Sequence, residues 1–183
     1  MAGGKVSGKG QAAILTPDQV REVIELARMP YRVAIAIAAY TGCRMGEAIA
    51  LRAENIQDGA IVFTKTKTGE VRTVGIHPRL AEILQDAQLP QAGYLFPSNG
   101  GKALGHITRQ AVDKELRAVC EGLGIQGVGT HSFRRTALTT MKNGGIPVKD
   151  IAAISGHRSL DELARYLEVT EKDKARAIAT LCY

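Results

Sequence analysis

The segment from Tyr31 to Tyr40 limits most strongly how this chain can fold, because it is apolar around the whole circumference of a helix. Such a helix is stable only when other elements cover it, so the sequence predicts a buried helix that ends at Thr41-Gly42. The longest apolar stretch, Val33 to Tyr40, is far shorter than the roughly 20 residues of a membrane span. Residues 1–10 are rich in glycine and lysine and have no apolar core of a signal peptide. We therefore expect a protein of the cytoplasm, with no membrane partner.

Amphipathic helices are predicted on both sides of this segment. The first begins at Thr16, which caps it, with Pro17 in the first helical position and Gln19 at the capping-box position. It runs to about Arg28. Further helices are predicted at residues 45–51, 78–88, 105–122, 131–143, 148–155, 160–167 and 171–181.

Two short segments follow a different period. Residues 61–64 and 71–76 are rich in β-branched side chains, and they flank residues 65–70, in which Thr68-Gly69 suits a turn. This pattern predicts a β-hairpin, and residues 94–96 are expected to add a short strand. The expected fold class is α+β, mainly α-helical with a small antiparallel β-sheet.

The chain is long enough for one hydrophobic core, and it contains no linker between domains. We expect a flexible basic tail at residues 1–13 and one domain at residues 14–183. Cys43, Cys120 and Cys182 are too widely spaced for a zinc or disulfide motif, so no structural metal is expected. The net charge of +6 is compatible with binding a polyanion, although many basic domains bind no nucleic acid.

The first of four segments with candidate functional residues is Thr41 to Glu47. It places Arg44 at a helix start, directly after a glycine break. A guanidinium beside exposed helix N–H groups is suited to holding a phosphate. An ion pair between Arg44 and Glu47, one turn later, is the structural alternative.

The second segment contains His131 and Arg134, which lie one turn apart on one face of a predicted helix. The neighbouring cation favours a neutral imidazole, which is able to accept a proton near neutral pH. A surface pair at a helix start is the alternative.

The third segment joins the Gly156-His157 turn to Tyr166. Ser159 and Glu162 have capping-box spacing, so a helix is expected to start between them, with His157 ahead of it and Tyr166 near its end. The structural alternatives are a packing role for Tyr166 and a simple helix end at Gly156-His157.

The fourth segment is the predicted hairpin tip, which contains Lys65 and Lys67. Lysines in loops are normally solvated. Each of the four signals is therefore weak when it is taken alone.

Together, the four segments resemble the tyrosine recombinase family, which includes phage integrases, Xer-type resolvases and fimbrial invertases. Arg, Lys, His-x-x-Arg, Gly-His and Tyr follow in the family's order over about residues 14–166. Arg134 and His157 are 23 positions apart and His157 and Tyr166 are nine apart, as in that family. The resemblance implies the catalytic-domain fold of tyrosine recombinases.

The resemblance also implies a reaction on double-stranded DNA. Tyr166 would attack a backbone phosphate and form a 3′-phosphotyrosine, which a second DNA end would then reverse. Arg44 and Arg134 would hold the non-bridging oxygens, so that neither a metal ion nor ATP is needed. His131 would accept or relay the tyrosine proton, and His157 would bond to a phosphate oxygen.

By the same resemblance, Lys67 would protonate the departing 5′-oxygen. Lys65 is the alternative, because hairpin lengths vary in the family. Lys67 fits better since it directly precedes Thr68-Gly69 and lies five positions before Arg72.

Some features depart from the family pattern. Arg135 and Leu163 stand where members often have His and Thr, but neither position is catalytic. Most members also carry an N-terminal core-binding domain, which we do not expect in residues 1–183, so the expectation is either a fragment or a minimal protein like the fimbrial invertases. A type IB topoisomerase-like activity and a non-catalytic DNA-binding relative are the alternative functions.

The segment after Tyr166 predicts an amphipathic helix at residues 171–181. Its apolar stripe consists of Ala175, Ile178, Ala179 and Cys182. The helix would pack either on its own domain or on a neighbouring copy, which in this family assembles as a tetramer on DNA. A location at the nucleoid follows from this expected function.

Overall fold

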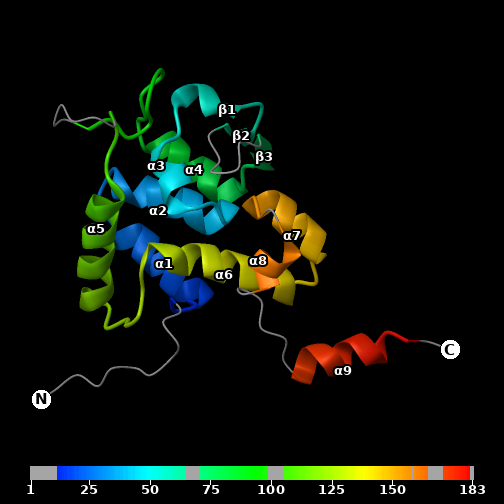
Figure 1. The fold of residues 1–183 in the computed structure, drawn as a ribbon. Coiled ribbons are helices and arrows are strands. Elements are labelled where there is room, and N and C mark those ends of the chain that lie inside the picture. Colours follow the sequence, from blue (N-terminus) through cyan, green and yellow to red (C-terminus); the bar gives the residue numbers. More distant parts are fainter. Residues whose placement is uncertain (1–11, 65–70, 99–104, 158, 165–170, 182–183) are drawn as a thin grey trace, which may run out of the picture.

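The computed structural model describes residues 12–64, 71–98, 105–157, 159–164 and 171–181. A body of helices carries a small sheet at one edge (Figure 1), so the predicted fold class is confirmed. The helices are α1 (Pro17–Leu26), α2 (Tyr31–Thr41), α3 (Met45–Ile49), α4 (Pro78–Asp86), α5 (Arg109–Gly122), α6 (Thr130–Asn143), α7 (Val148–Ser155), α8 (Leu160–Ala164) and α9 (Glu171–Ala179), with a short 3-10 turn at Ala53–Asn55. None of these helices is long and apolar enough to cross a membrane in the part of the chain that is described.

Helix α2 is the buried helix that the sequence predicts. Every residue from 33 to 38 is fully buried, and α1, α3, α4, α5 and α6 all pack against it. The helix ends at Gly42, whose φ of 65° is the left-handed conformation that favours glycine. This end of α2 directly precedes Arg44.

The predicted hairpin is confirmed in its two strands. The sheet has the order β1 (Ile56–Gln57), β2 (Ala60–Phe63) and β3 (Arg72–Gly75), all antiparallel, and Phe63 pairs with Arg72. The predicted turn lies outside the described residues. Strand β1 was not predicted, because two residues are too few to show a period.

The two larger differences from the predictions concern residues 94–96 and the start of α5. Residues 94–96 form no named strand in the described structure; Tyr94 makes only an isolated bridge to Arg52. Helix α5 begins at Arg109, four residues later than expected, because Thr108 caps it: its Oγ accepts a hydrogen bond from the Ala111 N–H at 3.2 Å.

The predicted start of α1 is confirmed, with both hydrogen bonds of the capping box between Thr16 and Gln19. Contacts with the body begin before the expected domain boundary. The carbonyl of Ala12 accepts from the Arg135 side chain at 2.7 Å, and the N–H of Ala13 donates to the Gly127 carbonyl at 3.0 Å.

A second, small apolar cluster joins the last helices of the body. Leu138 of α6, Ile151 of α7 and Leu163 of α8 are each fully buried against one another. Leu163, one of the departures from the family pattern, is therefore a packing residue. The cluster fixes α6 and α7, which carry the residues described next.

Candidate active site

Arg134 lies at the centre of the candidate site. Its side chain is 2% exposed, although arginine is rarely buried. Nη1 donates to the carbonyl of Gly42 at 2.8 Å and to that of Ser155 at 2.7 Å. The guanidinium therefore ties the end of α2 to the end of α7.

His157 follows the end of α7, where Gly156 adopts a φ of 68°. Nη2 of Arg134 lies 3.0 Å from Nε2 of His157 and 3.2 Å from Nδ1, so this nitrogen lies over the face of the ring. Oγ of Ser155 lies 2.7 Å from Nδ1. Burial and then the charge of Arg134 lower the pKa of His157 to about 4, so its imidazole is neutral at pH 7.

Arg44 occupies the N-cap position of α3, at the helix start expected from the sequence. Its Nη1 donates to the Gly156 carbonyl at 3.5 Å, and its Nη2 lies 3.3 Å from Oε1 of Glu162 on α8. Nη1 also lies 3.7 Å from Oε1 of Glu47. The ion pair with Glu47 and the approach to the Gly156-His157 turn therefore occur together.

His131 lies on the first turn of α6 and is exposed. Partial desolvation lowers the pKa of this imidazole, and the positive charges of Arg109, Arg134 and Arg44 lower it further. This direction agrees with the predicted neutral imidazole. Arg109, at the start of α5, was not predicted as a neighbour of this residue.

The described structure thus brings together four of the six predicted site residues: Arg44, His131, Arg134 and His157. Tyr166 and Lys67, together with the alternative Lys65, lie outside the described residues.

An ion pair next to this group was not predicted from the sequence. Nη1 and Nη2 of Arg72 lie 3.2 and 2.8 Å from the two carboxylate oxygens of Glu47, and both side chains are less than 10% exposed. Burial alone would raise the pKa of Glu47, but the hydrogen bonds from Arg72 and the Arg44 N–H lower it below its usual value. The alternation of side chains along β3 could have indicated this pair, because Arg72 lies on the same face of the strand as buried Val74.

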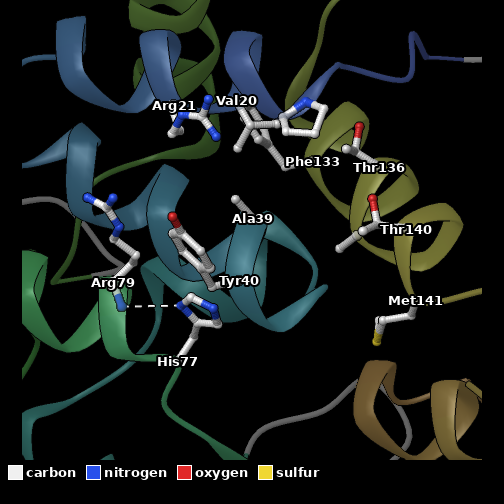
Figure 2. Close-up of a pocket in the computed structure, with 12 residues that line it drawn as sticks. Val20, Arg21, Ala39, Tyr40, His77, Arg79, Phe133, Thr136, Thr140 and Met141 are labelled. Carbon is white, nitrogen blue, oxygen red and sulfur yellow. Dashed lines mark hydrogen bonds between the residues drawn. The ribbon is translucent and has the colours of Figure 1, made fainter. Parts of the chain in front are cut away.

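The pocket shown in Figure 2 is a different place. It has a volume of about 460 Å³ and lies between α1, α2, the start of α4 and α6. Its lining includes Val20, Ala39, Tyr40, Phe133 and Met141, and none of the four grouped residues. Within the described ranges, no three His, Cys, Asp or Glu side chains are grouped to hold a metal ion.

The chain matches known proteins over most of its length. The model of the phage integrase family matches residues 13–173. The integrase of Escherichia phage P2 is 27% identical over 158 residues, which are 86% of this chain and 43% of that protein. The chain spans about half the length of the curated relatives that it matches.

Two solved structures have the same fold. The catalytic domain of bacteriophage HP1 integrase has a TM-score of 0.69 at 22% identity, with 92% of this chain and 95% of that chain covered. The XerH site-specific recombinase bound to difH substrate, a pre-cleavage complex, has a TM-score of 0.71 at 19% identity and covers 90% of this chain and 53% of that chain.

Proposed function

The chain belongs to the phage integrase family, and on that basis we propose that it is the catalytic domain of a site-specific tyrosine recombinase that cleaves and rejoins double-stranded DNA. One observation carries the proposal. Arg44 and Arg134, which come from distant parts of the sequence, both bond to the short turn that contains His157. A fixed pair of guanidinium groups is suited to the charge that builds up on a phosphate in its transition state.

Each residue has a role in this proposal. Tyr166 attacks the phosphorus, the 5′-oxygen leaves with a proton from Lys67, and a 3′-phosphotyrosine remains. Arg44 and Arg134 hold the non-bridging oxygens and supply the charge that a metal ion would supply in other enzymes. The bond energy stays in the phosphotyrosine, so ATP is not consumed.

The two histidines have different environments. His131 is exposed and neutral near pH 7, so it is able to accept the tyrosine proton. His157 is buried against Arg134 and bonds to a phosphate oxygen. Such an enzyme acts on chromosomal or phage DNA, and we place it at the nucleoid in the cytoplasm.

A nicked-duplex experiment tests the reaction. A pool of end-labelled duplexes with randomised sequence and one nick traps the covalent product, because the short cleaved strand diffuses away. We expect a labelled protein band in denaturing gels and a nucleotide-modified peptide that contains Tyr166. The band should be lost in Tyr166→Phe and retained in the matched control Tyr183→Phe.

Other outcomes assign other functions. Binding of the duplexes with no covalent band would leave a DNA-binding relative without catalysis. Relaxation of supercoiled plasmid by the wild type, with no joining between two duplexes, would indicate activity of the type IB topoisomerase kind.

We further propose that the chain assembles as a tetramer on DNA through α9. This helix stands apart from the helical body in Figure 1, and Ile178 on it is 68% exposed. An apolar stripe left in water is typical of an interaction surface. The mostly apolar pocket of Figure 2 is the proposed acceptor in the neighbouring copy.

Light scattering with and without the nicked duplex tests this assembly. Ile178→Asp on α9 and Ala137→Asp in the pocket should each reduce the assembled fraction on DNA. Lys174→Asp changes charge on the same helix and is the control for Ile178→Asp. A full tetramer with Ala137→Asp would exclude the pocket as acceptor.

A further inference from the structure

Three successive carbonyl groups at the C-terminal end of α7 each accept a hydrogen bond from a different arginine. The carbonyl of Ile154 accepts from Nε of Arg72 at 3.0 Å. The carbonyls of the next two residues accept from Arg134 at 2.7 Å and from Arg44 at 3.5 Å. The last carbonyls of a helix carry partial negative charge and lack partners within the helix, so this end of α7 is a natural anchor for guanidinium groups.

Arg72 differs from the other two arginines because all three of its guanidinium nitrogens bond to groups of the protein. Its Nη1 and Nη2 bind both oxygens of Glu47, its Nε binds the Ile154 carbonyl, and its guanidinium carbon lies 4.3 Å from the centre of the Phe63 ring. A bidentate pair with a third hydrogen bond and a stacked ring holds the guanidinium in one orientation. Arg72 is therefore suited to hold other groups in place, not to bind substrate.

We infer that Arg72 is a positioning residue for the proposed active site: it fixes both the α7 end that carries His157 and the carboxylate that orients Arg44. The second half of this link is direct, because Oε2 of Glu47 also accepts from the Arg44 N–H at 2.8 Å. Arg72 opens β3, so the sheet edge, α3 and α7 meet at one guanidinium. The catalytic consequence rests on the proposed function, whereas the positioning itself does not.

Gly156 supports this inference. A Cβ atom at this position would lie 2.8 Å from Nη1 of Arg72, closer than real Cβ contacts, and 3.0 Å from Cζ, tighter than most of them. The positive φ of Gly156 already favours glycine. The guanidinium therefore packs directly against the backbone of the turn, and a displacement of Arg72 reaches His157 through one residue.

The His157 ring reports on this position without any DNA. The charged groups that face it are Arg134 of α6, Arg44 before α3, Arg72 of β3 and Glu162 of α8. Burial and the three arginines lower its pKa, while Glu162 raises it. Loss of Arg72 removes one positive charge and loosens the turn, and both changes raise the pKa of His157.

The first experiment is an NMR titration of the histidine rings in the free full chain. The chain has four histidines, and His157→Gln assigns the resonance in question. In Arg72→Gln we expect the pKa of His157 to rise from about 4 toward the ordinary value of about 6.5. Arg72→Lys keeps the charge but loses the fork, so it should give a smaller rise, and it carries the measurement if Arg72→Gln does not fold.

The second experiment measures covalent adduct formation on the nicked duplexes. A small displacement of catalytic groups commonly slows a reaction by roughly 100-fold, so Arg72→Lys should slow adduct formation roughly 10- to 100-fold and weaken DNA binding less than about threefold. Arg52→Lys is the matched control, because Arg52 pairs with Glu54 at an exposed site. It should leave both the rate and the titration unchanged.

Failure of this inference and failure of the proposed function give different results. An unchanged His157 titration in Arg72→Gln, or an unchanged adduct rate in Arg72→Lys, would overturn the inference. A wild-type protein that forms no adduct, yet shows the titration shift in Arg72→Gln, would overturn the proposed function and support the positioning.

Discussion

Oγ of Ser155 lies 2.7 Å from Nδ1 of His157, and the same oxygen lies 2.6 Å from the carbonyl oxygen of Ile151. A carbonyl only accepts, so the single hydroxyl proton of Ser155 is donated to Ile151. Nδ1 of His157 must then carry the proton of the other hydrogen bond. The neutral ring is therefore the Nδ1–H tautomer, with the lone pair of Nε2 on the nitrogen nearer to Arg134.

This tautomer refines the proposed role of His157. A neutral ring with a lone pair on Nε2 accepts from a protonated phosphate oxygen, but it donates to one only after it gains a second proton. A bound phosphate is an anion and raises the pKa of a nearby imidazole. DNA binding and proton uptake by His157 are therefore linked.

The tautomer predicts the behaviour of Ser155→Ala. This change removes the acceptor of a buried N–H group, which costs about 1–3 kcal/mol of unfolding free energy. Nitrogen-15 chemical shifts should show the Nδ1–H form of His157 in the wild type and a mixture of tautomers in the variant. Thr180→Ala is the control, because it removes an exposed hydroxyl that also bonds to a helix carbonyl. An Nε2–H ring in the wild type would contradict the assignment.

The pKa of His157 also predicts how stability depends on pH. The pKa is about 4 in the folded chain and about 6.5 in the unfolded chain, so between these values only the unfolded state binds the proton. Stability contributed by this residue is thus complete above pH 6.5 and is lost as the pH falls toward 4. The loss amounts to about 3 kcal/mol.

Urea unfolding at several pH values between 4 and 7 measures this loss. Other groups also change charge as the pH falls, so the comparison is with His157→Gln. The wild type should lose more stability than this variant as the pH falls. Parallel curves for the two proteins would show that His157 is not held neutral by the fold.

The sequence was sufficient for the parts of this fold that depend on local pattern. A segment that is apolar on all sides predicted α2, the capping box predicted the start of α1, and runs of β-branched residues predicted β2 and β3. The start of α5 was placed four residues early, because Thr108 is a cap that the apolar pattern alone does not reveal. The apolar composition of α2 predicts that the helix is buried, but it does not predict which helices pack against it.

The site was harder to predict, since its hydrogen bonds join distant segments. The spacing of motifs was enough to group Arg44, Arg134 and His157. It gave no sign that Arg72 and Glu47 form a buried pair, because the partners lie 25 positions apart and Arg44 offered Glu47 a nearer partner. The sign of a buried partner was a charged residue on the inner face of β3. Its role becomes clear only in the structure, where β3 packs against α7.

We expect Arg134→Lys to lose the cleavage reaction while it keeps the fold. An ammonium is a single point and is unable to reach the Gly42 and Ser155 carbonyls while it also contacts His157. One buried carbonyl left without its donor costs about 1–3 kcal/mol. Loss of one fixed donor to a transition state slows chemistry by roughly 100- to 1,000-fold, which adduct formation on nicked duplexes measures.

Arg135→Lys is the matched control for this change. Arg135 is the next residue on α6, and its Nη1 bonds to the Ala12 carbonyl, away from the site. Adduct formation should be preserved in this variant. If the two substitutions slow the reaction equally, the effect belongs to α6 as a whole and not to the Arg134 fork.

The pair of His131 and Arg109 predicts a shift in the pH profile of the reaction. If His131 accepts the tyrosine proton, adduct formation must fall at acid pH as the ring becomes charged. Among the positive charges that lower the pKa of this ring, Arg109 has the largest effect, so Arg109→Gln should raise that pKa. The acid limb of the rate profile should therefore move to higher pH, with little change on the plateau. Arg117→Gln, farther along α5 and paired with Asp113, should leave the limb in place. An acid limb that stays fixed in Arg109→Gln, while the NMR titration of His131 shifts, would show that another group accepts the proton.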